Sequence, residues 1–245
     1  MALLTGTQYL PPPPPALTSE RYARDVNEVK LLGAVNSATR TPAQTEIARL
    51  WAGLTTAGTG TSTSLFAIWN NVARDVSRER HLSLLETARV FALLNVAMHD
   101  GLQTTQVSKF VYGLWRPVTA IREADTDLNP ATDPDPGWLP LITSPPYPAC
   151  AGNMAVIGAG AARALQLAFG TDDIPITLTW RQSGGLPEVS HQFGGFWEAA
   201  EEHSMARIYG GVHYRFDQEA GQQIGTAVAE FVFSNYMTPR RRGNE

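Results

Sequence analysis

The chain has 245 residues, of which 43% are hydrophobic and 17% charged, a balance that predicts one compact domain with a sizeable core. Its formal net charge of −4 argues against nucleic acid as the main partner, so any anion site has to be built from a few locally placed cations. The single cysteine, Cys150, excludes a disulfide within the chain and a zinc cluster with several cysteines.

No apolar run in the sequence approaches the roughly 20 residues that a helix needs to cross a bilayer. The first ten residues have neither a basic start nor a long apolar stretch, so they do not resemble a signal peptide. We therefore expect a soluble protein without a membrane span, cytoplasmic as written and exported if the true start lies upstream. A small-molecule substrate is the expected partner, and a homo-oligomer stays open.

The N-terminal part combines a proline-rich arm with the first helices. The unbroken run Pro11–Pro15 predicts an extended arm over residues 1–21, followed by a helical domain over residues 22–245. Thr41–Pro42–Ala43–Gln44 is a helix start, because threonine and glutamine at this spacing form a capping box and proline fits the first turn. Apolar residues at helical spacing predict a second helix over residues 62–79.

The longest predicted helix begins at another capping box, Ser83–Leu84–Leu85–Glu86, and runs to about Tyr112. It is apolar nearly all round in its middle, so we expect it at the centre of the fold. Pro117 stops it and pushes Arg116 out of helical geometry. A loop follows over residues 123–148, with spaced aspartates that lack the glycine and closing glutamate of a calcium loop.

The C-terminal half predicts three further helices, over residues 153–169, 193–209 and 217–236, and a short candidate strand at 174–180. Strands and helices do not alternate, and no glycine-rich nucleotide loop follows a strand. The predicted fold class is therefore all-α, a bundle of six or seven helices with long loops.

Three stretches place unusual polar residues at helix ends. In the first, Lys109 lies near the end of the central helix, and Arg116 follows about two turns later, roughly 10 Å along an uninterrupted helix. Lysine is a compact charge and arginine a planar fork of donors, so both could face one pocket. Taken alone, the pair is better explained as the solvated end of a helix, where cations are favoured.

The second stretch is the turn before helix 153–169, with Gly152 and Asn153 at its end. Free N–H groups at a helix start form an anion cradle, and a glycine lets the backbone come close to a ligand. A plain junction capped by Asn153 is the competing interpretation.

The third stretch carries the strongest signal for a tetrahedral anion such as phosphate or vanadate. Arg207 lies near a helix end, Gly210–Gly211 allows a tight turn, and His213 and Asp217 follow. The imidazole can attack or coordinate an electrophilic centre through one nitrogen, while the aspartate accepts from the other and fixes the tautomer. A turn histidine and an N-capping aspartate explain the same residues, and the cap is compatible with the chemical role.

The other histidines carry weaker signals. His203 lies one turn before Arg207 on the same helix face, which makes it a candidate to support the site. His99 is expected to be a satisfied core histidine, and His81 and His191 are expected in loops.

Together the three stretches resemble the superfamily of type-2 phosphatidic acid phosphatases and vanadium-dependent haloperoxidases. The shared pattern is Lys, six residues, Arg–Pro; a glycine-bearing turn before a helix; and Arg, five residues, His, three residues, Asp. Residues 114–121 (LWRPVTAI) and 207–214 (RIYGGVHY) resemble its soluble bacterial haloperoxidase-like branch, and the similarity runs from about residue 22 to residue 236.

The resemblance implies an acid phosphatase/haloperoxidase-type helical bundle that binds vanadate or phosphate at one end. It implies that Lys109, Arg116 and Arg207 neutralise the oxygens of the anion. It also implies that His213 binds the vanadium or phosphorus, with Asp217 orienting the ring. In a peroxidase the anchored vanadate would activate hydrogen peroxide, and in a phosphatase the histidine would form a phosphohistidine.

The chain departs from the family in the middle motif, which is usually Pro–Ser–Gly–His. A gapless alignment sets Ala151–Gly152–Asn153–Met154 on this motif, and a shift of one residue sets Ala151–Gly152–Asn153 on Ser–Gly–His. In both alignments the serine and the histidine are missing, although Gly152 and Asn153 still offer N–H donors to an anion. Neither methionine nor asparagine has a pKa suited to acid–base chemistry.

These observations predict three functions, in decreasing order of support. The first is a haloperoxidase-like oxidoreductase that binds vanadate or phosphate and uses peroxide, with Arg207, His213 and Asp217 as catalytic residues. The second is a phosphatase of the same superfamily that hydrolyses phosphomonoesters. The third is an anion-binding member with impaired catalysis, because loss of a general acid or base commonly costs on the order of 10²–10⁴ in rate.

Overall fold

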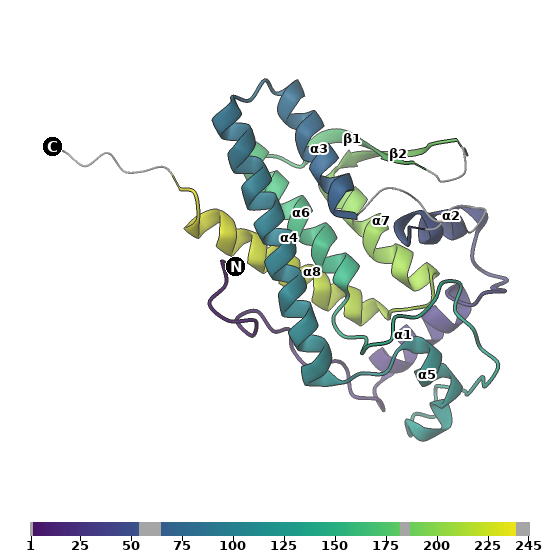
Figure 1. Cartoon of the computed structure of the whole chain (residues 1–245). Helices are drawn as coiled ribbons and strands as arrows, with labels where there is room; N and C mark the ends of the chain where they lie inside the picture. The colour runs from purple at the N-terminus through teal and green to yellow at the C-terminus, as the bar shows by residue number, and fades with distance from the viewer. Residues whose placement is uncertain (1, 54–64, 182–186, 239–245) are drawn as a thin grey trace.

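The computed structural model describes residues 2–53, 65–181 and 187–238, which form mainly helices with one two-stranded sheet. Figure 1 shows a bundle of long helices, with α1 and α5 at its lower end and the sheet at its upper end. The elements in chain order are α1 (Glu20–Leu32), α2 (Pro42–Trp51), α3 (Leu65–Glu79), α4 (Leu84–Tyr112), α5 (Pro117–Arg122), a 3₁₀ turn (Ala124–Thr126), α6 (Asn153–Phe169), β1 (Asp173–Trp180), β2 (Val189–Gly195), α7 (Phe196–Tyr209) and α8 (Arg215–Asn235).

The all-α fold class is confirmed, and the middle of the bundle is α6. This helix packs against α4, α7 and α8, and its residues 154–162 are buried without interruption. Its alanines and glycines present little side-chain volume, so neighbouring helices approach it on several sides. The long helix α4 begins at the predicted Ser83 capping box and ends at Tyr112, where Gly113 adopts a left-handed conformation with φ 57°.

Two glycines of α8 set its distance from α6. A Cβ atom on Gly221 would lie 2.6 Å from the carbonyl oxygen of Gly152, and one on Gly225 would lie 2.5 Å from that of Val156. Neither backbone could hold its present position against such a side chain. The close approach brings the first turns of α6 and α8 together, and the N–H of Gly152 donates to the carbonyl of Asp217 at 2.9 Å.

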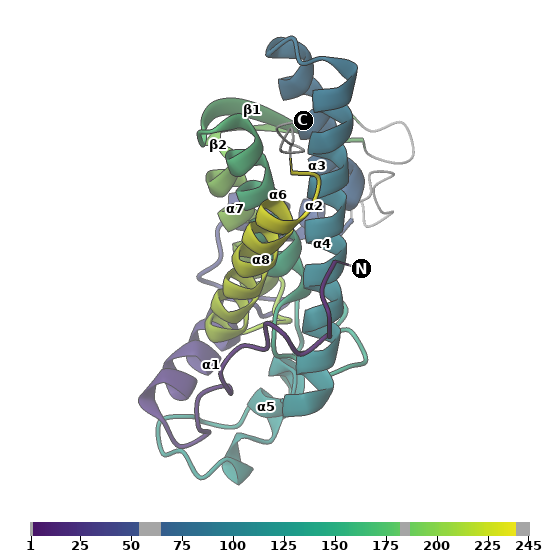
Figure 2. The ribbon, with the colours of Figure 1, turned by 90° about the vertical axis from the view of Figure 1, so that its left-hand side faces the viewer.

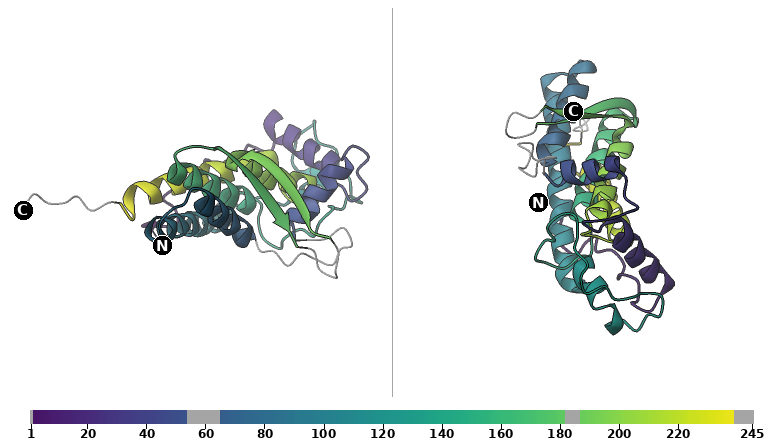
Figure 3. Two further views of the ribbon diagram at one scale, coloured as in Figure 1. Left: turned by 90° about the horizontal axis from the view of Figure 1, so that it is seen from above. Right: turned by 90° about the vertical axis from the view of Figure 1, so that its right-hand side faces the viewer.

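The sheet is an antiparallel hairpin of β1 and β2 that lies at the end of the molecule away from α1 (Figure 3, right). Alternate residues of β1 are buried, and the ring of Trp180 packs edge-on against Trp51 of α2 with 5.1 Å between centroids. The candidate strand at 174–180 is therefore confirmed. The expectation of loop around His191 and of helix from Phe193 was wrong, because both residues pair with β1 as part of β2.

Two further helices were not predicted. Ser19 caps α1 by accepting the N–H of Tyr22 at 3.2 Å, and Tyr22 and Val29 are buried in a cluster with residues of α5. Pro117 was expected to stop the long helix, but α4 already ends at Tyr112 with Gly113 as its cap. Pro117 instead begins α5, because proline fits the first position of a helix. The described residues thus contain eight α-helices, more than the six or seven expected.

Two expected helix starts also differ in detail. Gly152, not Asn153, occupies the cap position of α6. The last helix begins at Arg215, so Asp217 lies within its first turn and accepts the N–H of Tyr214 at 3.3 Å. The expected start at residues 62–64 lies outside the described residues.

The proline-rich arm packs on the bundle. Figure 2 shows this purple segment running beside the lower half of α4. The N–H of Leu3 donates to Asp100 at 3.0 Å, and the hydroxyl of Tyr112 donates to the carbonyl of Pro11. Among the helices in the described part of the chain, none has the length and apolar character needed to cross a membrane.

The glycine contact between α6 and α8 predicts an unusual response to alanine. Gly225→Ala should lower the free energy of unfolding by about 1–3 kcal/mol, because the methyl group overpacks the contact. At an unconstrained helical site the same change would stabilise by roughly 1 kcal/mol. Urea unfolding measures the difference, with Gln223→Ala at an exposed position of α8 as control. Equal or greater stability of Gly225→Ala would show that the helices can separate freely.

Candidate functional site

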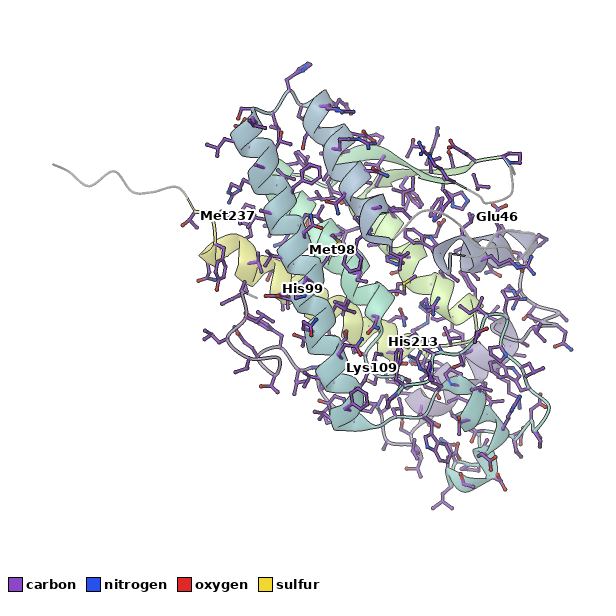
Figure 4. The ribbon with its side chains drawn as sticks, viewed as in Figure 1. Glu46, Met98, His99, Lys109, His213 and Met237 are labelled. Carbon is purple, nitrogen blue, oxygen red and sulfur yellow. The ribbon has the colours of Figure 1, made fainter. Side chains whose placement is uncertain are left out.

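The polar residues singled out in the sequence meet at one end of the bundle. Figure 4 shows Lys109 near the lower end of α4 close to His213, well away from His99 on the same helix. Arg116 comes from the residue before α5, Arg207 from the last turn of α7, and Asp217 from the first turn of α8. Each of the five site side chains is at most 9% exposed. They therefore form a buried cluster.

His213 is held from both sides. Its Nδ1 lies 2.9 Å from Oδ2 of Asp217, and its Nε2 lies 2.9 Å from Nη1 of Arg116. An arginine can only donate, so Nε2 accepts and we assign the proton to Nδ1. Burial, and then the charge of Arg116, hold the pKa of His213 well below its usual value. The ring is neutral, with its reactive lone pair on Nε2.

Arg116 is fixed mainly by backbone carbonyls. Its Nε donates to the carbonyl of Tyr147 and its Nη1 to that of Val212, each at 2.8 Å. The ring of Tyr147 lies 4.9 Å from the guanidinium carbon. Within the described residues the remaining nitrogen, Nη2, is buried without a hydrogen-bond partner. The extended backbone predicted before Pro117 is confirmed, with ψ 156°.

Lys109 is fully buried, so its interpretation as a solvated helix end was wrong. Its Nζ donates to the carbonyls of Ala149, at 2.8 Å, and Ala151. Burial lowers the pKa of the ammonium group, and the nearby Arg116 lowers it further. The lysine thus ties the segment before α6 to α4 while adding positive charge to the cluster.

Arg207 completes an excess of positive charge. Burial, and then Arg116, lower the pKa of Arg207 to about 10, and its Nε has no hydrogen-bond partner among the described residues. Among the described residues of the cluster, three basic side chains (Lys109, Arg116 and Arg207) share a single carboxylate, Asp217. Burial raises the pKa of this carboxylate. Buried charges are costly unless compensated, so this arrangement favours a bound anion.

The middle motif contributes differently from expectation. The N–H of Gly152 is already donated to Asp217, so it is not free for a ligand. The amide oxygen of Asn153 is buried without a partner in the described residues. The sulfur of Met154 lies 3.2 Å from Nε2 of His203, which is fully buried on α7.

His203, the candidate to support the site, lies one turn from Arg207 on α7. Its ring stacks on Trp51 with 4.1 Å between centroids. Burial, and then Arg207, lower the pKa of His203 to about 3. This histidine is neutral near neutral pH and does not by itself replace the acid–base group that the middle motif lacks.

Sequence reasoning missed Tyr147 and the contact between Met154 and His203. Tyr147 lies in the proline-rich loop before α6, and its ring is 5.6 Å from Nζ of Lys109 as well as close to Arg116. No motif marks this tyrosine, and only the fold brings it over the cations.

Comparison with known proteins agrees with the geometry. The profile of the "VCPO second helical-bundle domain" matches residues 89–241, which is more than half of the chain. The chain belongs to the vanadium haloperoxidase superfamily.

Individual relatives are similar over most of this chain but are longer. The vanadium chloroperoxidase of Curvularia inaequalis is 27% identical over 240 residues, covering 78% of this chain and 39% of its own length. The structure of a bacterial vanadium-dependent iodoperoxidase is 26% identical, with a TM-score of 0.75, and covers 95% of this chain and 54% of its own. An apo bacterial vanadium-dependent chloroperoxidase, at 13% identity and a TM-score of 0.70, covers 96% and 53% and shows the same fold.

The buried histidines predict an acid-sensitive fold. In the folded protein the pKa of His203 is lowered to about 3, so the ring stays neutral. In the unfolded chain the same ring takes up a proton below about pH 6.5. Acid therefore favours the unfolded state, and the free energy of unfolding falls between about pH 6.5 and pH 3. Below pH 6 the free energy of unfolding should fall by about 1.4 kcal/mol per pH unit for each such histidine. In His203→Asn this slope should be smaller by about that amount.

Urea unfolding at pH 7.5, 6.0 and 5.0 measures both slopes. His81→Asn is the control, because His81 is exposed and its positive φ of 53° suits asparagine. An unchanged slope in His203→Asn would contradict the prediction.

Proposed function

We propose that this chain is a haloperoxidase-like oxidoreductase domain that binds vanadate, or phosphate in the same site, and uses peroxide. The observation that carries the proposal is a neutral His213 whose Nε2 accepts a hydrogen bond from Arg116, within a buried cluster that also holds Lys109 and Arg207. The family membership and the similarity to vanadium-dependent peroxidases support this choice among anion-binding functions.

The residues present fit a tetrahedral oxyanion. Nη2 of Arg116 and Nε of Arg207 are buried donors without partners in the described residues, and an anion would accept from both. Lys109 adds a third positive charge from α4. The anion would also offset the buried charge excess, so its binding should stabilise the folded state.

The chain's own residues would orient and hold the ligand. Asp217 keeps the proton on Nδ1, so the lone pair of Nε2 would be available to hold a vanadate or phosphate group. Arg116, which donates to Nε2 here, would donate to the anion instead. Bound vanadate would supply an electron-poor centre that activates hydrogen peroxide toward a halide or an organic substrate.

The proposed activity has a direct test. With orthovanadate, hydrogen peroxide and bromide, the protein should brominate a phenolic dye above the level of a His213→Ala control, because that variant lacks the anchoring nitrogen. Dye absorbance measures the rate. No difference between the two proteins would remove the peroxidase proposal.

Phosphomonoester hydrolysis is the second candidate, because the same orphan donors suit phosphate. Hydrolysis that vanadate inhibits and that Arg207→Ala abolishes would identify this function. Hydrolysis untouched by Arg207→Ala would count against it.

The missing middle-motif histidine predicts slow turnover. Met154→His places an imidazole where the gapless alignment expects one, beside the neutral His203. Turnover should rise by on the order of 10²-fold, since a positioned acid or base commonly contributes 10²–10⁴. The rate at saturating peroxide measures the gain, with Met154→Leu as the control for the loss of sulfur. Equal rates in both variants would show that acid–base chemistry at this position does not limit the reaction.

A further inference from the structure

A buried amide beside the anion site lacks a hydrogen-bond partner. Gln218 follows Asp217 in the first turn of α8 and is only 3% exposed. Its Oε1 accepts the hydroxyl of Ser204 from α7 at 3.4 Å, which orients the amide, but in the described structure Nε2 has no acceptor. A buried donor left unpaired is energetically unfavourable, so the nitrogen indicates that an acceptor is bound there in the functional protein.

The amide of Gln218 occupies the space that a side chain at position 152 would take. A Cβ atom on Gly152 would lie 2.9 Å from both Cδ and Oε1 of Gln218 and would collide with Nε2. Position 152 therefore has room for a side chain or for this amide, but not for both. In the gapless alignment Gly152 stands where the family carries serine.

The position of the amide is fixed by its surroundings. The N–H of Gly152 donates to the carbonyl of Asp217, the residue that precedes Gln218, so the two backbones cannot slide apart. Asp217 in turn holds His213 through the same first turn of α8. The amide thus lies against Gly152, between the start of α6 and the turn of α8 that also carries Asp217.

We propose that Gln218 is a further anion-binding residue, whose amide nitrogen donates to the oxyanion from the space that a serine at position 152 would fill. This inference rests on the proposed function of the site. Like Arg116 and Arg207, Gln218 has a buried side-chain donor that lacks a partner among the described residues. It adds a donor without adding charge, which suits a cluster that already holds three cations.

Calorimetric titration of the whole chain with inorganic phosphate and with orthovanadate tests the proposal. Gln218→Met keeps the length of the side chain and removes the donor. Its affinity for both anions should fall about tenfold or more, because a hydrogen bond to a charged group contributes roughly 1.5–3 kcal/mol. Gln223→Met, at an exposed position one turn further along α8, should bind like the unmodified protein.

A swap variant tests the geometry itself. Gln218→Ala frees the space above Gly152, and Gly152→Ser then returns a hydroxyl donor to it. The double variant should bind phosphate more tightly than Gln218→Ala alone. Gln218→Glu, which keeps the shape but carries a negative charge, should bind more weakly than Gln218→Met.

The outcomes separate the two proposals. Equal phosphate and vanadate affinities for the unmodified protein and Gln218→Met would overturn the role of Gln218 and leave the proposed function standing. A double variant no better than Gln218→Ala would overturn the assignment to the serine position. Absence of anion binding by the unmodified protein would overturn both, and circular dichroism of each variant verifies that it is folded.

Discussion

The hydrogen bond between Nδ1 of His213 and the carboxylate of Asp217 determines what the other site residues have to do. It leaves Nε2 as the reactive atom, but it requires a carboxylate in the interior. A buried carboxylate is stabilised by nearby cations, and here Lys109 and Arg116 both lower its pKa against the effect of burial. With Arg207 the positive charges outnumber the negative one. The same arrangement that holds the histidine therefore also leaves an excess of buried positive charge beside it, as the proposed anion site requires.

The precision of this arrangement comes from backbone packing. Gly221 and Gly225 allow α8 to touch the backbone of α6, so the first turns of both helices share one wall. Lys109 then binds two carbonyls of the segment that precedes α6. A site assembled by such contacts loses little entropy when a ligand arrives, because its donors are already ordered.

The sequence indicated the polar residues of the site well, because each lies in a short motif at a helix end. Arg116 before Pro117 and His213 before Asp217 have local spacings that limit where their side chains can point. The sequence did not indicate the burial of Lys109, since a lysine in the last turn of a helix usually reaches solvent. That burial depends on the segment around Ala149, forty residues further along the chain.

Several of the missed features depend on pairing between distant segments. Strand β2 has a weak pattern of its own and forms because it pairs with β1. The amide of Gln218 looks like an ordinary polar residue of a helix until α6 is packed against it. The arm was expected to be extended, but only the fold shows that Asp100 holds its first residues.

The hydrogen bond from Arg116 occupies the lone pair of Nε2 of His213, the atom that a ligand would contact. Any ligand has to displace this bond before it reaches the histidine. A halide ion accepts hydrogen bonds from arginine but offers nothing to the lone pair of the histidine. Its hydrogen bond to Arg116 would only replace the one that Arg116 already makes to His213. A tetrahedral oxyanion accepts from the arginine through its oxygens and offers an electron-poor centre to the nitrogen. Under the proposed function, the closed contact would favour ligands that satisfy both partners at once.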